Sequence, residues 1–166
     1  MKIIHTSDWH LGHTIYGHDR TEEQDSMLEQ MRALVSEIQP DLFLLCGDVF
    51  HVAQPSSYVQ TVFTEALMRL HEACPDMRIV VTAGNHDSPS RHEVFKRPWE
   101  ELNVFMTGTV SKESPRNNII EIPGKGYVAA VPYCSERNLP EGFHQNLLDL
   151  VAERNTAGLP VVMTAH

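Results

Sequence analysis

Five polar side chains able to bind metal ions follow four short apolar runs of the sequence: Asp8, His10, Asp48, Asn85 and His166. Their carboxylate oxygens, amide oxygen and imidazole nitrogens, with no thiolate, suit Mn²⁺, Fe²⁺ or Zn²⁺. Two such ions about 3.5–4 Å apart would bind phosphate oxygens and lower the pKa of a shared water toward neutrality. The residue types therefore predict a two-metal site that acts on a phosphate ester.

Each motif taken alone has an ordinary structural explanation. Asp8 and His10 lie two residues apart, so in an extended segment both project to the same side, but such a triplet also arises by chance. Asp48 after Gly47 could simply cap the following loop. Only the complete set at four strand ends is specific.

The segment 84–87, Gly-Asn-His-Asp, adds two candidate catalytic residues. With Asn85 on the metal, His86 is left to act on substrate as a proton donor or beside a developing oxyanion. We expect Asp87 to orient that imidazole, as carboxylates commonly do. A plain turn is the alternative.

The four apolar runs have the pattern of strands buried on both faces, each followed by small residues. They cover residues 3–8, 42–48, 79–86 and 161–166. Between them the apolar period changes to that of helices. One helix follows the candidate cap Thr21, with Gln24 three residues later, and its apolar stripe reaches Ile38. Two more are predicted from near Pro55 and over residues 141–154.

Alternating strands and helices predict an α/β fold with parallel strands and right-handed crossovers. Ligands of such sheets bind beyond the carboxyl ends of the strands, where the five metal-binding candidates would gather. Residues 104–106 predict a further strand, and residues 119–131, with a turn at 123–126, predict a hairpin.

The composition places the chain among ordinary cytoplasmic domains. It has 166 residues and a formal net charge of −9, and no run reaches the ~20 apolar residues that a membrane span needs. The three cysteines are widely spaced, which favours reduced packing residues over disulfides. Acidity disfavours unaided binding of nucleic acid, unless bound metal ions supply the positive charge.

The motifs together resemble the calcineurin-like metallophosphoesterases, whose signature runs DxH, GD, GNH(D/E), a His after a late strand and a final GHxH. Within that family the chain is most similar to nucleases that repair DNA double-strand breaks. The matching stretches are residues 5–12, 47–51 with Pro55-Ser56, 84–88 and 131–133. The resemblance covers essentially the whole chain in order.

The resemblance implies a four-layer α/β/β/α sandwich and a metal-dependent DNA nuclease. Its activities would be 3′-to-5′ exonuclease on duplexes and endonuclease on single strands, with two divalent ions, for which Mn²⁺ is the expected metal. Asp8 and His10 would hold one ion, Asn85 and His166 the other, and Asp48 both. His86 would be catalytic, and His51 would position the phosphate or else simply pack its loop.

The resemblance also implies partners: DNA, an ATPase subunit, and a second copy of the chain. The dimer contact is expected at residues 56–72 and 91–102. His13, Tyr16, His18 and Arg20 could touch DNA, although an ordinary solvated loop is favoured. His71, His92 and His144 are interpreted as ordinary core or surface histidines.

One departure concerns the end of the chain. The family's final GHxH and its capping domain would come after residue 166, so residues 1–166 are expected to be the N-terminal part of a C-terminally truncated domain. Each ion then keeps three protein ligands, which predicts weak metal binding and poor cleavage. The alternatives are a small-substrate phosphatase or cyclic-nucleotide phosphodiesterase of the same family, or a non-catalytic subunit that docks a partner.

Overall fold

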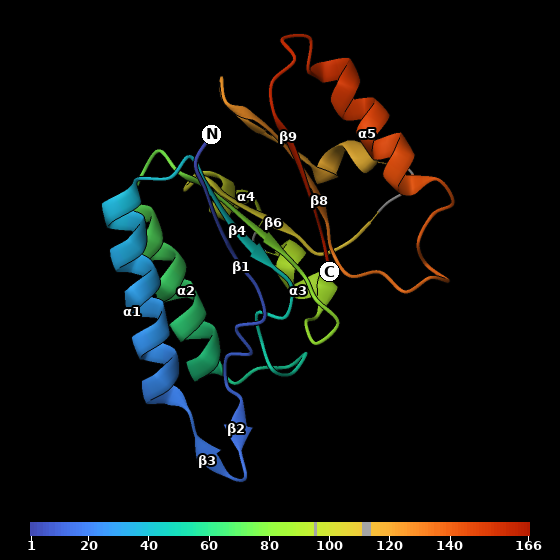
Figure 1. Cartoon of the computed structure of the whole chain (residues 1–166). Coiled ribbons are helices and arrows are strands. Elements are labelled where there is room, and N and C mark those ends of the chain that lie inside the picture. Colours follow the sequence, from blue (N-terminus) through green and yellow to red (C-terminus); the bar gives the residue numbers. More distant parts are fainter. Residues whose placement is uncertain (95, 111–113) are drawn as a thin grey trace.

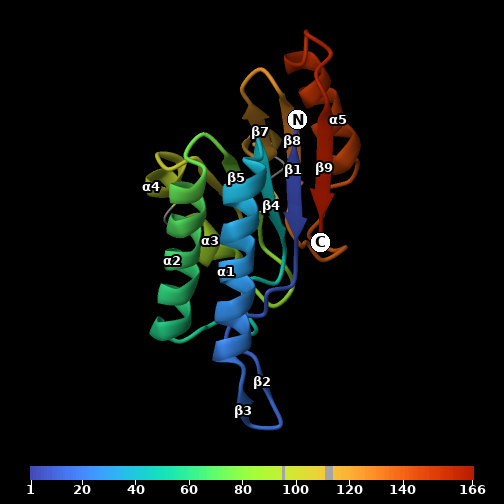
Figure 2. The same cartoon turned by 60° about the vertical axis from the view of Figure 1, so that its left-hand side comes forward.

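The computed structural model describes residues 1–94, 96–110 and 114–166. These residues form four layers, in which helices flank two β-sheets packed face to face (Figures 1 and 2). Three separate hydrophobic clusters fill the spaces between the layers. The α/β/β/α architecture expected from the sequence is thereby confirmed.

The first sheet contains four parallel strands in the order β1-β4-β5-β6. Their bounds are Ile3–Thr6 for β1, Leu42–Cys46 for β4, Arg78–Thr82 for β5 and Val104–Thr107 for β6. Because all four strands run in one direction, their carboxyl ends meet at a single edge of the sheet. The segments with the candidate site residues leave the sheet at this edge.

Two long helices cover the outer face of this sheet, side by side in Figure 1. They are α1 (Thr21–Ile38) and α2 (Ser57–Ala73). Val35 and Leu67 pack with Phe43 of β4 in one cluster, and each is essentially inaccessible to water. Two short helices, α3 (Pro89–Val94) and α4 (Lys96–Glu100), precede β6.

The second sheet has the order β7-β8-β9. The predicted hairpin is confirmed, with β7 (Ile119–Ile122) antiparallel to β8 (Gly126–Val131), and a 3₁₀ turn (Pro115–Asn118) precedes it. Strand β9 (Val161–Ala165) runs parallel to β8, and α5 (Phe143–Arg154) packs on the outer face through Phe143, Leu147 and Val151. The inner face meets the first sheet through Ile120 and Val128 against Leu44 and Val80.

Two of the four apolar runs are not buried on both faces as predicted. β4 is buried throughout and β5 is buried after Arg78, but β1 and β9 are the outermost strands of their sheets. Ile3 of β1 is 39% exposed and Val161 of β9 is 41% exposed. An apolar run reports that a segment is a strand, but its place in the sheet depends on partners distant in sequence.

The start of α1 also differs from the prediction. Thr21 is the first helical residue and not the cap, and the carboxylate of Asp19 accepts hydrogen bonds from its backbone N–H and its hydroxyl. For α2, Ser56 is the cap, since its hydroxyl oxygen accepts a hydrogen bond from the Val59 N–H at 3.3 Å. The expected loop before α1 contains a small antiparallel hairpin of β2 (Thr14–Ile15) and β3 (His18–Asp19).

The cysteines agree with their predicted packing role. Cys46 and Cys74 are buried, Cys134 is partly buried, and all three thiols are free. Burial raises the pKa of the Cys46 thiol, which contacts the Thr164 hydroxyl of β9 across the two sheets. Among the described residues, none of the helices combines the length and apolar character needed to cross a bilayer.

Candidate metal centre

The loops that follow β1, β4 and β5 remain hydrogen-bonded to one another beyond the strands. The Asp8 N–H donates to the Gly47 carbonyl at 3.1 Å, and the Gly47 N–H donates to the Thr82 carbonyl at 3.0 Å. Further along, the His10 N–H donates to the Asp48 carbonyl at 3.0 Å. These bonds hold the segment of Asp8 and His10 beside the segment of Gly47 and Asp48.

The backbone of the first two motifs is left-handed and not extended. Asp8, His10 and Asp48 have φ angles of 56°, 44° and 49°. Such angles are uncommon for residues with a Cβ and persist only where surrounding contacts impose them, often at functional sites. Asp8 and His10 therefore approach through a tight turn, with Nε2 of His10 3.8 Å from Oδ1 of Asp8, and not through the predicted strand-like alternation.

Asp8, Asp48 and His166 form the acid cluster, in which one ligand atom of each residue lies within 4.8 Å of the others. Nε2 of His166 lies 3.6 Å from Oδ2 of Asp48, and Nε2 of His10 lies 3.7 Å from the same oxygen. Asp48 is only 3% exposed, whereas Asp8 is exposed. The buried Asp48 carboxylate thus lies at the centre of the predicted metal-binding residues.

Asn85 and His166 come from different sheets and meet at the acid cluster. Oδ1 of Asn85 lies 3.2 Å from Nε2 of His166. Nδ1 of His166 lies 3.2 Å from the carbonyl oxygen of Cys46, the position from which an Nδ1–H donates. A metal-binding histidine usually donates its second ring N–H in this way, which leaves Nε2 free for an ion.

Gly47 and Gly84 lie where other parts of the site approach the backbone too closely for any side chain. A Cβ on Gly84 would lie 2.1 Å from Oδ1 and 2.2 Å from the backbone nitrogen of Asp48. A Cβ on Gly47 would lie 2.1 Å from Nδ1 of His166, and Gly47 also has a φ of +81°. Only glycine lets these loops approach one another closely enough to form the cluster.

The loop after β4 holds both the backbone and the ring of His86. Its backbone N–H donates to Oδ1 of Asp48 at 2.8 Å, and its ring Nδ1 lies 2.8 Å from the carbonyl oxygen of His51. The His10 and His86 ring centroids are 4.9 Å apart. The His86 imidazole thus lies beside the acid cluster without belonging to it.

His51 and His13 extend this group of imidazoles, with ring centroids 4.2 Å apart. Partial burial lowers the pKa of His51, and the neighbouring charges of His13, His10 and His86 lower it further. His51 is therefore held more strongly in the neutral form than an isolated histidine. The sequence alone did not indicate that His13 would join this group.

Asp87 does not orient the His86 imidazole, which corrects the prediction. Its buried carboxylate instead accepts hydrogen bonds from the backbone N–H groups of Gly84, Val49 and Phe50 at 2.8–3.1 Å. Burial alone would raise the pKa of Asp87, but the His92 imidazole and these N–H groups lower it overall. The ionised Asp87 carboxylate therefore acts as a clamp that links the loop after Asp48 to the loop that contains Gly84. The His51 carbonyl, and not Asp87, orients the His86 ring.

Gln24 and His92 support the site and were missed by sequence reasoning. The Gln24 side chain donates to the His10 carbonyl at 3.0 Å and accepts from the Gly12 N–H at 3.2 Å, which ties the first motif to α1. His92 is 3% exposed and places Nε2 3.6 Å from Oδ2 of Asp87. Both contacts depend on the tertiary fold: the sequence indicated Gln24 only as part of a helix start, and His92 only as an ordinary histidine.

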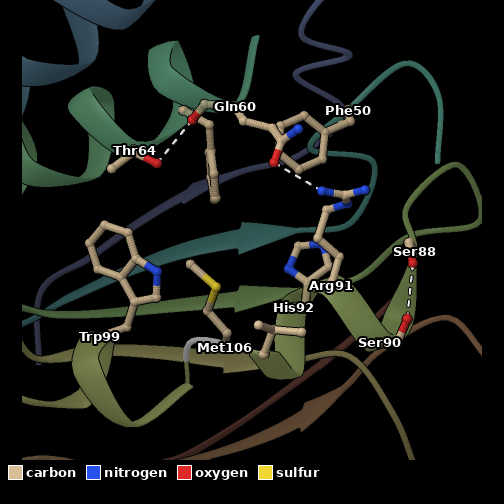
Figure 3. A pocket seen from close by; sticks show the side chains of 11 residues that line it. Phe50, Gln60, Thr64, Ser88, Ser90, Arg91, His92, Trp99 and Met106 are labelled. Atoms are coloured by element: carbon tan, nitrogen blue, oxygen red, sulfur yellow. Dashed lines mark hydrogen bonds between the residues drawn. The ribbon is translucent and has the colours of Figure 1, made fainter. Parts of the chain in front are cut away.

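A cavity of about 350 Å³ lies behind this clamp, between α2 and the segment of α3, α4 and β6 (Figure 3). Trp99 lies at one end of it and Arg91 at the other, with Met106 and His92 between them, and Arg91 donates to the Gln60 side chain at 2.9 Å. Of the residues that the structure describes, those that line the cavity include none of the metal-binding candidates. It is separate from the site at the strand ends.

The fold and the site define the class: the chain belongs to the calcineurin-like phosphoesterase family, whose model matches residues 1–166. This family uses divalent metal ions, and the donor types of the acid cluster fit such ions. Expectations of fold and family are thereby confirmed.

Several relatives are named as the D component of the nuclease SbcCD. The protein of Bacillus subtilis is 35% identical over 144 residues, which are 85% of this chain and 36% of the relative. Those of Rhodobacter capsulatus and Escherichia coli K12 are each 38% identical, covering 95% and 100% of this chain but 40% and 46% of the relatives. The chain thus spans less than half the length of these relatives.

Among solved structures, the nuclease MPE of Pseudomonas putida is similar with a TM-score of 0.43 and 18% identity. The alignment covers 81% of this chain and 55% of that one.

Proposed function

We propose that this chain is the catalytic part of a metal-dependent DNA nuclease of the SbcD type, which hydrolyses phosphodiester bonds in DNA repair. The observation that carries the proposal is the acid cluster, where Asp8, Asp48 and His166 converge from three strands of two sheets. The relatives named as part of the nuclease SbcCD support the choice of nucleic acid as substrate. The proposed activities are 3′-to-5′ exonuclease on duplexes and endonuclease on single strands.

Two Mn²⁺ ions are the proposed cofactors. Asp8, His10 and Asp48 would hold one ion, and Asp48, Asn85 and His166 would hold the other. The carboxylate and amide oxygens favour Mn²⁺, and the imidazoles are compatible with it. When bound, the ions would supply the positive charge that an acidic protein lacks and would activate water near neutral pH.

The remaining groups act on the substrate. His86 would donate a proton from Nε2 to the leaving 3′-oxygen in its imidazolium form, in which the Nδ1–H also donates to the His51 carbonyl. His51, whose ring stacks on His86 with 5.7 Å between centroids, would position the phosphate. Asp87 is proposed as a positioning residue, because its buried carboxylate accepts hydrogen bonds from three backbone N–H groups of the two loops.

DNA, an SbcC-type ATPase subunit and a second copy of the chain are the proposed partners. The relatives are named as one part of a complex called SbcCD, which supports the second of these. For the dimer, the proposed contact is α2 with the segment from Arg91 to Leu102, where Tyr58 and Val94 are 59% and 66% exposed. Light scattering would distinguish a dimer from a monomer.

The experiment that tests the function compares cleavage of duplex DNA with hydrolysis of p-nitrophenyl phosphate esters, with Mn²⁺ present. Slow DNA cleavage that chelation abolishes is the expected result, because each ion would have only three protein ligands. Turnover of the small esters alone would favour a phosphatase or cyclic-nucleotide phosphodiesterase. Inactivity towards both substrates, in a chain that binds Mn²⁺, would favour a partner-docking subunit. The assignment of residues 1–166 to the N-terminal part of a longer domain stays a prediction.

A further inference from the structure

His10, His51 and His86 form a second group of potential metal ligands, called here the imidazole trio. One ring nitrogen of each lies within 4.8 Å of the other two. The ring centroids of His51 lie 5.7 Å from those of His10 and of His86. Unlike the acid cluster, this group offers nitrogen donors only.

The orientation of the rings suits a metal ion. Nδ1 of His86 lies 2.8 Å from the His51 carbonyl oxygen, so that its N–H donates there and Nε2 keeps its lone pair. This is the outer contact that metal-binding histidines usually make. Nδ1 of His10 and Nδ1 of His51 are both buried without a hydrogen-bond partner among the described residues, which is costly for a polar atom.

Packing and charge also support a bound cation. The centroid of the His13 ring lies 4.2 Å from that of the His51 ring, with 33° between the ring planes, so the two rings pack together. Oδ1 of Asp8 and Oδ2 of Asp48 lie 3.8 and 3.7 Å from Nε2 of His10, so negative charge borders the trio. A dication at the trio would therefore have compensating carboxylates nearby.

We propose that the imidazole trio is a binding site for Zn²⁺, separate in donor chemistry from the Mn²⁺ site of the acid cluster. Three histidines with one open position form a familiar zinc arrangement. Zn²⁺ also binds nitrogen ligands more strongly than Mn²⁺ does. Zn²⁺ at the trio would occupy the lone pair of His86 and compete for His10, and so would inhibit cleavage. The inhibition rests on the proposed nuclease function, whereas the binding does not.

The test is a calorimetric titration of Zn²⁺ into Asp8→Asn, in which the acid cluster is weakened, and into the double variant Asp8→Asn/His51→Ala. We expect the double variant to bind one fewer Zn²⁺ per chain, because the affinity of the trio for Zn²⁺ should fall by ~100-fold or more. Mutation of a residue that only contacts a metal ligand typically costs about 10–100-fold in affinity, so loss of a ligand itself should cost at least as much. Asp8→Asn/His18→Ala is the matched control, because His18 is an exposed histidine of the nearby hairpin. It should bind Zn²⁺ as Asp8→Asn does.

Equal Zn²⁺ stoichiometry and affinity in Asp8→Asn and in the His51→Ala double variant would overturn the proposal. Asp8→Asn/His86→Gln serves as a second variant if the first is misfolded by circular dichroism, with the same expected loss. Cu²⁺ bound to Asp8→Asn should show hyperfine coupling to three nitrogens in its EPR spectrum, and coupling to one nitrogen would contradict the site. Zn²⁺ binding with no DNA cleavage at any metal concentration would refute the nuclease function alone.

Discussion

Asp87 and His92 form a buried pair behind the candidate metal centre, with Oδ2 of Asp87 3.6 Å from Nε2 of His92 and both side chains at most 2% exposed. The same carboxylate accepts backbone hydrogen bonds from the loops after β4 and β5. The pair therefore links the interior of the protein to two of the motifs that hold the site.

Replacement of Asp87 by Ala should destabilise the protein strongly. It removes the acceptor of three buried N–H groups and leaves His92 without its charged partner, which typically costs about 3–5 kcal/mol of unfolding free energy. Chemical denaturation measures this loss. Asp76→Asn, a change at an exposed carboxylate, should leave the free energy of unfolding within about 0.5 kcal/mol of the parent. A similar small effect of Asp87→Ala would show that the clamp contributes nothing.

Acid should remove the contribution of Asp87. Because its folded pKa is lower than its unfolded pKa of about 3.9, its charge stabilises the fold fully above that unfolded value. The stabilisation is lost as the pH falls below it through the folded pKa. The difference in unfolding free energy between the parent and Asp87→Ala should therefore narrow between pH 7 and pH 3. A constant difference across this range would contradict the ionised state of Asp87.

Gly84→Ala should weaken metal binding through crowding. The added methyl would lie 2.1 Å from Oδ1 of Asp48, so the carboxylate or its loop must move. We expect at least a tenfold loss of Mn²⁺ affinity, similar to the effect of removing a hydrogen bond that orients a metal ligand. Gly124→Ala is the control, since no atom of the described residues lies within 4 Å of its Cβ and only backbone strain at φ +66° results. Equal Mn²⁺ affinities of the two variants would contradict the crowding argument.

His86→Ala should separate binding from turnover. His86 lies beside the acid cluster but outside it, so Mn²⁺ affinity should stay within a few-fold of the parent, while DNA cleavage should fall by about 10²–10⁴-fold if His86 supplies the proton. His144→Ala, at an exposed site on α5, should cleave normally. Retained cleavage by His86→Ala would remove this residue from the proposed reaction.

Local sequence patterns were enough to predict most helices and strands, because apolar period and turn residues act over short distances. Strand β1 shows the limit: Ile3 and Ile4 predict a buried strand, yet the sheet places them at its edge. Similarly, the motif around Asp8 was recognisable, but its left-handed backbone was not, since the turn is imposed by hydrogen bonds to Gly47 and Asp48.

The supporting contacts of the site could not be read from residue types. Asp87 follows His86 directly, so an orienting contact between them was the natural expectation. In the structure its carboxylate contacts three backbone N–H groups and His92 instead. The contacts with Val49 and Phe50 join residues far apart in the sequence and become visible only when the loops are placed in space.

The most direct test of the account is the stoichiometry of Mn²⁺ binding to the parent chain and to Asp48→Asn, measured by calorimetry and by EPR of free Mn²⁺. The buried Asp48 carboxylate lies close to ring nitrogens of both His10 and His166 and is proposed to serve both ions. We predict two Mn²⁺ per parent chain and a loss of both in Asp48→Asn, with Asp76→Asn unchanged. Binding of two Mn²⁺ by Asp48→Asn with parental affinity would contradict a two-metal centre at this position.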